Sequence, residues 1–183
     1  MSVLEHTTTI PSGSYAADPA HSSVEFSVRH MGLATIRGRA SAVAATLDAT
    51  GDQPVIEGTI DAASLTTFDE QRDGHLTSPE FFDTGRFPTI SFRSTGFEPR
   101  ADGTATLAGE LTLKGVTRPI ELEAVISGPG QDPWGNERVG VDISGALNRT
   151  DYGVSWNAPL PGGGLLLDDR VRLEASFSFV KQG

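Results

Sequence analysis

The most persistent pattern along the chain is an alternation of apolar and polar residues. At residues 171–179 every second side chain is apolar, and at 104–113 every second residue is apolar or glycine. Shorter stretches at 24–29, 120–126 and 139–144 repeat the pattern. Successive side chains of an extended strand point to opposite faces, so a period of two predicts antiparallel strands with one buried and one solvent-exposed face.

Between two of the expected strands the pattern changes to one typical of helix starts. Thr67 and Glu70 have the spacing of a capping box, in which a hydroxyl and a carboxylate satisfy the first free amides of a helix. Ser78 followed by Pro79 is a second N-cap pattern. The patterns predict two short helices at 68–75 and 79–83, between strands at 54–61 and 88–97.

Composition favours an all-β domain. Val, Ile and Thr total 38 residues against 15 Leu, and β-branched side chains pack well on pleated surfaces. The 21 Gly and 11 Pro residues supply turns. One open sheet of so many strands would leave two edges and an apolar face uncovered, so we expect two packed sheets or a closed barrel. We predict one such domain over residues 1–183.

One stretch bears on what fills the interior. The even positions from 36 to 44 are nearly all small, and they are Ile36, Gly38, Ala40, Ala42 and Ala44. The odd positions change from polar, at Arg37 and Arg39, to apolar, at Val43 and Ala45. A polarity change within one strand predicts a bend or bulge. Small inward residues leave room for a ligand, or large neighbours fill the space.

Charge and cysteine content exclude several classes of function. The 14 Lys and Arg against 24 Asp and Glu give a net charge of −10, and no basic stripe stands out, which excludes nucleic-acid binding. The absence of Cys excludes disulfides, thiolate zinc sites and cysteine nucleophiles. The longest Leu run, Leu165–Leu167, is far short of the roughly 18 apolar residues of a membrane span.

The first twelve residues contain neither a basic segment nor an apolar segment of the kind found in secretory leaders. We therefore expect residues 1–12 to form a flexible N-terminal arm. On the same ground we expect the protein to be cytoplasmic.

No catalytic motif is evident, and we predict a protein that is not an enzyme. The chain contains no Gly-x-Ser-x-Gly elbow, phosphate-binding loop or dinucleotide fingerprint. Two alternatives stay open. His21, His75 and Asp83 could converge as a metal site or as the acid–base set of a hydrolase or isomerase. A barrel packed solid could instead serve as a stress-related interaction module with Leu165–Leu167 as its contact patch.

Several segments carry recognisable motifs. They are DPAHSSVEFSVRHMG at 18–32 with IRG at 36–38, HLTSPEFFD at 75–83 with FPTISF at 87–92, GELTLKGVTRP at 109–119, and NRTDYGV at 148–154. Together they resemble the YceI-like family. The resemblance implies a lipocalin-like antiparallel barrel of about eight strands, whose apolar interior holds a polyisoprenoid lipid or quinone tail and needs no other cofactor. It also implies a homodimer, since dimers are common in the family. Independently of the resemblance, we expect no transmembrane segment and at most transient contact with membranes. Many relatives are periplasmic, in contrast to the expectation from residues 1–12.

If the barrel holds such a lipid, apolar residues on the buried faces and at one opening should contact it. The predicted ligand-binding residues are Phe26, Val28, Met31, Ile36, Ala40, Ala42, Phe81, Phe82, Phe92, Leu111, Trp156 and Phe177. Trp134 and Trp156 are expected at the rim of an opening, where amphipathic rings are favourable. The glycine-rich segment from Gly162 to Leu167 is expected to be a mobile flap. Arg149 to Tyr152 is expected to hold a bend.

Overall fold

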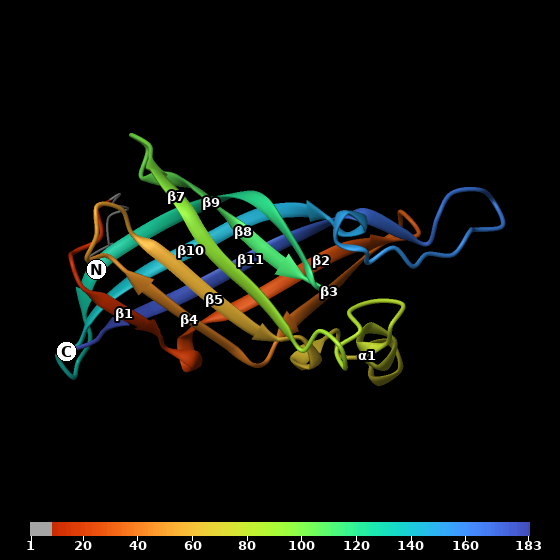
Figure 1. Ribbon diagram of the computed structural model, residues 1–183, viewed down its shortest axis with the longest axis horizontal. Coiled ribbons are helices and arrows are strands. Elements are labelled where there is room, and N and C mark those ends of the chain that lie inside the picture. Colours follow the sequence, from red (N-terminus) through yellow and green to blue (C-terminus); the bar gives the residue numbers. More distant parts are fainter. Residues whose placement is uncertain (1–8) are drawn as a thin grey trace.

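The alternating segments form one antiparallel sheet that closes on itself. The structure, a computed structural model, describes residues 9–183. They form a closed barrel with eight strand positions around its circumference and one α-helix (Figure 1). The strands are β1 (Ser14–Ala17), β2 (Ser23–His30), β3 (Ala34–Ala40), β4 (Val43–Asp48), β5 (Val55–Asp61), β6 (Leu65–Thr66), β7 (Thr89–Pro99), β8 (Thr104–Leu113), β9 (Val116–Gln131), β10 (Glu137–Asn148) and β11 (Leu167–Lys181). The prediction of a lipocalin-like all-β barrel is confirmed.

At three of the eight strand positions, two consecutive strands follow one another along the barrel. β1 and β2 share the first position and both pair with β11. β3 and β4 share the next position, and β5 and β6 share the third. From β7 to β11 each strand pairs with the next in chain order. The barrel is therefore an up-and-down meander, and the pairing of β11 with β1 and β2 closes it. The predicted strands at 54–61 and 88–97 correspond to β5 and β7.

The predicted bend near residue 40 is confirmed and lies between β3 and β4. Ala40 is buried before the break, whereas Ala45 and Leu47 are buried after it, so the inward side chains change from even to odd positions. The change occurs at Ser41–Ala42, where the Ser41 amide donates to the carbonyl of Ser64 in the opposite break between β5 and β6. The polarity change in the sequence therefore marks a change of face.

One predicted helix is present and the other is wrong. The α-helix α1 (Glu70–Thr77) begins after Asp69, whose carboxylate accepts from the Arg72 amide. Residues 79–83 form turns instead of a second helix. Ser78 is the C-cap of α1, and its hydroxyl donates to the His75 carbonyl at 2.7 Å. The residue before a proline is driven out of the helical region, so Ser78-Pro79 ends a helix here instead of starting one.

Three short 3-10 helices complete the regular structure of the described residues. They are η1 (Pro19–His21), η2 (Ala62–Ser64) and η3 (Arg149–Tyr152). The start of β1 and the C-terminus lie at one end of the barrel, here called the terminal end, where the Gln182 amide donates to the Ser14 carbonyl (Figure 1). Figure 1 shows α1 and the loop before β11 toward the opposite end, here called the capped end. The segment Arg149–Tyr152, which was expected to hold a bend, forms η3.

Of the predicted N-terminal arm, residues 1–8 lie outside the described residues. Ile10 packs against the main core, and the carbonyl of Pro11 accepts a hydrogen bond from the Tyr15 hydroxyl at 2.9 Å. The segment from Ile10 to Pro11 therefore contacts the barrel, and the flexibility expected for residues 1–12 stays a prediction.

The core is divided between the two ends. At the terminal end, large side chains occupy the interior, and the least exposed include Tyr15, Leu47, Leu107, Ile126 and Phe179. A second, smaller cluster at the capped end contains Phe81, Leu113, Tyr152 and Val154. The space between these clusters is where the barrel could hold a ligand.

Two wall aromatics occupy the places of missing side chains. A Cβ on Gly38 would lie 2.3 Å from Cζ of Phe26, and one on Gly109 would lie 2.4 Å from Cε2 of Phe92. Both contacts are far inside van der Waals distance, so a side chain at either inward position must displace the aromatic ring. At Gly38 the alternative that large neighbours fill the room left by small residues is therefore correct.

We expect Gly109→Ala to lower the free energy of unfolding by about 1–3 kcal/mol, because the new methyl group overlaps the Phe92 ring and the Arg93 carbonyl. Urea titration followed by circular dichroism measures this change. Gly96→Ala in the neighbouring strand β7 is the matched control, since its Cβ would meet only Ala108 at 3.7 Å. Equal stability of the two variants would contradict the packing described here.

Candidate functional site

A cavity of about 660 Å³ lies inside the barrel between the two core clusters. Its wall is made mainly of inward side chains from the strands, and α1, the turn after it and the segment before β11 contribute the capped end. The volume is in the range of small-molecule and cofactor sites. The interpretation of the protein as a solid barrel is therefore wrong for this part of the interior.

Most of the predicted ligand-binding residues line this cavity. They are Phe26, Val28, Ile36, Phe81, Phe82, Phe92, Leu111, Trp156 and Phe177. The structure thus gathers residues from strands far apart in the sequence around one apolar space. Their contact with a ligand stays a prediction.

The other three predicted residues do not line the cavity. Met31 is 42% exposed in the turn between β2 and β3, where its φ of 56° belongs to a tight turn instead of a strand. Ala42 is exposed because it follows the change of face at the β3–β4 break. Ala40 is buried but lies outside the cavity wall. Ala42 was expected to point inward because the even-numbered positions before the break do, but the inward positions are odd-numbered after it.

Several wall residues were not singled out from the sequence. Val171 and Leu173 of β11 and Ile143 of β10 belong to alternating segments, so the period of two could have found them. Leu76 of α1 and the pair Leu166 and Leu167 also line the cavity. They lie outside regular alternation, and only the folding of α1 and the loop against the barrel brings them to the wall.

An aromatic cluster lies at the capped end of the cavity. The ring of His75 makes edge-on contacts with Phe81 and Trp156, at centroid distances of 4.8 and 4.7 Å. Phe81 and Trp156 are 5.5 Å apart. His75 Nε2 lies 2.6 Å from a carboxylate oxygen of Glu80, which orients the imidazole. The cluster connects α1, the following turn and the segment before β11 across the end of the barrel.

The buried guanidinium of Arg149 connects two segments at the capped end, the one after η3 and the start of β11. Nη1 donates to the carbonyls of Val154 and Trp156 at 2.9 and 2.8 Å, and Nε donates to the carbonyl of Asp168 at 3.0 Å. Nη2 donates to the carboxylate of Asp169 at 3.1 Å. Burial lowers the pKa of Arg149, and the Asp169 carboxylate opposes this effect. The side chain therefore positions Trp156 by binding its backbone.

The segment before β11 is a hydrogen-bonded hairpin. The Asn157 side chain donates to the Leu167 carbonyl at 2.7 Å and accepts from the Leu167 amide at 2.9 Å, as a strand backbone would. Nearer the tip, the Leu160 amide donates to the carbonyl of Gly164. Of the three consecutive leucines, Leu165 is 55% exposed and the next two line the cavity. The mobility expected for this segment stays a prediction.

Asp73 attaches α1 to the barrel. Its carboxylate accepts from the Thr66 hydroxyl at 2.7 Å and from the amide and hydroxyl of Thr67 at 2.7 and 2.6 Å. Burial alone would raise the pKa of Asp73, but the hydrogen bonds from Thr67 and Thr66 outweigh it and keep the pKa below its ordinary value. Thr67 was expected to cap the helix, and it instead binds a residue inside it.

The proposed acid–base set is not assembled. His21 lies in η1, and its Nδ1 is 2.8 Å from the carboxylate of Asp18, the N-cap of η1. The imidazole of His75 instead bonds to Glu80. The buried Asp83 lies 3.6 Å from Arg86. Within residues 9–183 no group of three His, Asp or Glu side chains is placed to hold a metal ion.

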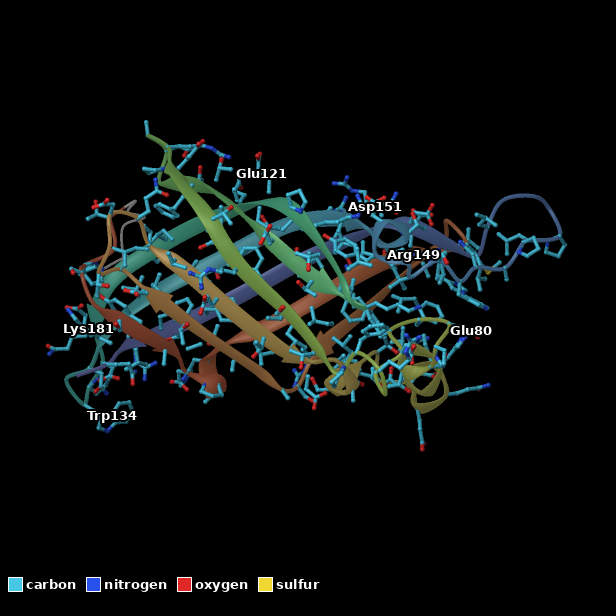
Figure 2. The ribbon with its side chains drawn as sticks, in the orientation of Figure 1. Glu80, Glu121, Trp134, Arg149, Asp151 and Lys181 are labelled. Atoms are coloured by element: carbon cyan, nitrogen blue, oxygen red, sulfur yellow. The ribbon has the colours of Figure 1, made fainter. Side chains whose placement is uncertain are left out.

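The two tryptophans lie at opposite ends of the barrel. Trp134, 82% exposed at the turn between β9 and β10, lies at the terminal end near Lys181, far from Arg149 and Glu80 (Figure 2). Trp156 lines the cavity. The expectation that both ring an opening is therefore wrong for Trp134.

Arg149→Met should lower the free energy of unfolding by about 3–5 kcal/mol, because it leaves buried carbonyls without donors. Urea unfolding at neutral pH measures the loss. Arg100→Met is the control, since Arg100 forms an exposed ion pair with Glu123, and we expect a change below about 1 kcal/mol. A similar small change in both variants would contradict the role given to Arg149.

The attachment of α1 should weaken in acid. The pKa of Asp73 in the folded chain lies below the ordinary 3.8, so its stabilisation is complete above that value and is lost as the pH falls through the folded pKa. Asp73→Asn should lower stability by about 1–3 kcal/mol at pH 7, with a difference that shrinks below about pH 4. Hydrogen exchange of the α1 amides measures it, with the exposed Glu70→Gln as control. A difference independent of pH would argue against the carboxylate.

Comparisons with known proteins agree with this fold. The model of the YceI-like domain matches residues 15–179. A UPF0312 protein of Vibrio vulnificus is 36% identical over 160 residues, covering 85% of this chain and 82% of the relative. One from Vibrio parahaemolyticus is 33% identical over 176 residues, covering 90% of each.

Solved structures share the barrel. Burkholderia cenocepacia BcnA superposes with a TM-score of 0.77 at 19% identity, covering 88% of this chain and 98% of that one. A polyisoprenoid binding domain from Saccharophagus degradans, implicated in plant cell wall breakdown, gives a TM-score of 0.70 at 13% identity over 94% and 100% of the two chains. Within residues 9–183 there is no helix with the length and apolar character needed to span a bilayer.

Proposed function

The chain belongs to the YceI-like family, and from that premise we propose that it binds a polyisoprenoid or a similar amphiphilic lipid, such as a quinone tail, without catalysis. The observation that carries the proposal is the apolar cavity of about 660 Å³ enclosed by the barrel. The description of the Saccharophagus degradans neighbour as polyisoprenoid-binding supports it by analogy of fold.

The size of the cavity suits several isoprene units. If each carbon takes about the 30 Å³ that a water molecule occupies in the liquid, the cavity holds on the order of twenty carbons, or about four isoprene units. Burying twenty carbons gains about 16 kcal/mol at ~0.8 kcal/mol each. Association costs of at least 4 kcal/mol reduce this gain, and micromolar binding needs about 8 kcal/mol. An apolar chain of this length can therefore bind without a strong polar anchor.

Two polar side chains at the capped end of the cavity are already engaged, which favours binding over chemistry there. The Arg149 guanidinium donates to backbone carbonyls and Asp169, and the imidazole of His75 bonds to Glu80. A general base or nucleophile needs a free group within reach of a reacting atom. The proposed mechanism is accordingly transfer of a lipid tail from water or membrane into a dry interior.

Neighbouring residues of β4 offer a matched test of this proposal. Ala45 lines the cavity and is 7% exposed, whereas Ala44 is exposed on the outer face. We expect Ala45→Trp to fill the cavity and weaken binding of a short polyprenol or quinone at least tenfold, and Ala44→Trp to bind as the unmodified chain does. Native mass spectrometry after incubation with the lipid, followed by extraction, measures occupancy.

Circular dichroism checks that both variants fold, and Val28→Trp provides a second cavity-filling variant if Ala45→Trp does not. Full occupancy of a folded Ala45→Trp or Val28→Trp protein would contradict the interior site. So would a protein that takes up neither quinones nor polyprenols.

A further inference from the structure

The capped end carries an exposed apolar tip. Leu33 is 77% exposed and Met31 is 42% exposed in the turn between β2 and β3, and Leu165 is 55% exposed in the adjacent hairpin. The Met31 amide donates to the carbonyl of Leu166 at 2.7 Å, so turn and hairpin form one surface. Apolar side chains exposed together at a tip point to an apolar or interfacial partner.

The outer face beside this tip is basic. Arg172 of β11 and Arg37 of β3 both lie opposite Ser27 of β2, so the two guanidinium groups flank one position of the outer surface. Arg29 follows one step nearer the tip, where its guanidinium donates to the carbonyl of Gly32. Arg170 precedes Arg172 on β11 and is exposed.

The arginines of this face differ from several others in the described chain. Arg37, Arg170 and Arg172 form no ion pair within the described residues, whereas Arg93, Arg100 and Arg138 each pair with a carboxylate. Nearby acidic groups are present. Asp168 and Asp169 follow Leu167 at the start of β11, and Asp169 is bound to Arg149. Glu25 and Glu174 lie one row farther from the tip. A net charge of −10 repels an anionic surface unless the protein presents such a face to it.

We propose that the protein docks on anionic lipid bilayers through this end, with Leu33 and Leu165 among the head groups and Arg29, Arg37, Arg170 and Arg172 against the phosphates. Arginines beside exposed leucines match the charge and polarity of a bilayer interface. The hairpin is continuous with the cavity, because Leu165 is exposed while Leu166 and Leu167 line the wall. Docking goes beyond the proposed lipid binding and does not require an occupied cavity.

Flotation with vesicles free of isoprenoids tests the docking surface. We expect binding to vesicles containing phosphatidylglycerol, and at least tenfold weaker binding to pure phosphatidylcholine or at high salt. Arg37→Glu with Arg172→Glu should weaken binding at least tenfold. Arg93→Glu with Arg100→Glu makes the same charge change on β7 and just after its end, and this variant should bind as the unmodified chain does. Leu33→Ser with Leu165→Ser should weaken binding without changing net charge.

Three results would overturn the proposal. The first is no binding to the anionic vesicles, and the second is an equal loss of vesicle binding in the two Arg→Glu pairs. The third is a dimer in gel filtration that Leu33→Ser with Leu165→Ser dissociates, because this would assign the tip to a second copy of the chain. Because the vesicles contain no cavity ligand, lipid uptake measured separately distinguishes failure of docking from failure of the proposed function.

Discussion

The whole molecule depends on the ladder that closes the barrel at β11. On one edge β11 pairs with β10 from Arg138 to Asn148, and on the other it pairs with β1 and β2. Closure places neighbours around the whole sheet, although the second edge of β3 pairs with β6 only at Arg39 and Ala40, and it gives the sheet one inner and one outer face. The alternation of apolar and polar residues then decides which face is inner. The cavity exists because this closure encloses more space than the inward side chains fill.

Side-chain size decides where that space remains. At the terminal end Tyr15, Phe97 and Phe179 belong to one buried cluster that occupies the interior. Farther along, the rings of Phe26 and Phe92 lie over glycines, which keeps them against the wall. Phenylalanine therefore occupies the barrel axis at the terminal end and leaves it open in the middle. The difference depends on whether the neighbouring strand has a glycine beside the ring.

Polar interactions hold the cap, in contrast to the backbone ladder of the barrel. The Arg149 guanidinium, the Asn157 amide and the Asp73 carboxylate each bind backbone groups of a separate segment. These bonds are few and act separately, whereas opening the ladder breaks many bonds together. The basic, apolar tip lies at this same end, so the part of the molecule that faces a membrane in our proposal is also the part that covers the cavity.

The sequence by itself determined the all-β class, the strands and even the change of face between Ala40 and Ala45, because a period of two depends only on which face of a strand is buried. It placed Phe26, Phe92 and Phe177 correctly on inner faces for the same reason. The tertiary structure alone decided that Ser78-Pro79 ends a helix, that Leu166 and Leu167 reach the cavity wall, and that His21 lies apart from His75. These features depend on contacts between segments far apart in the chain, and a local pattern contains no information about which segments will meet.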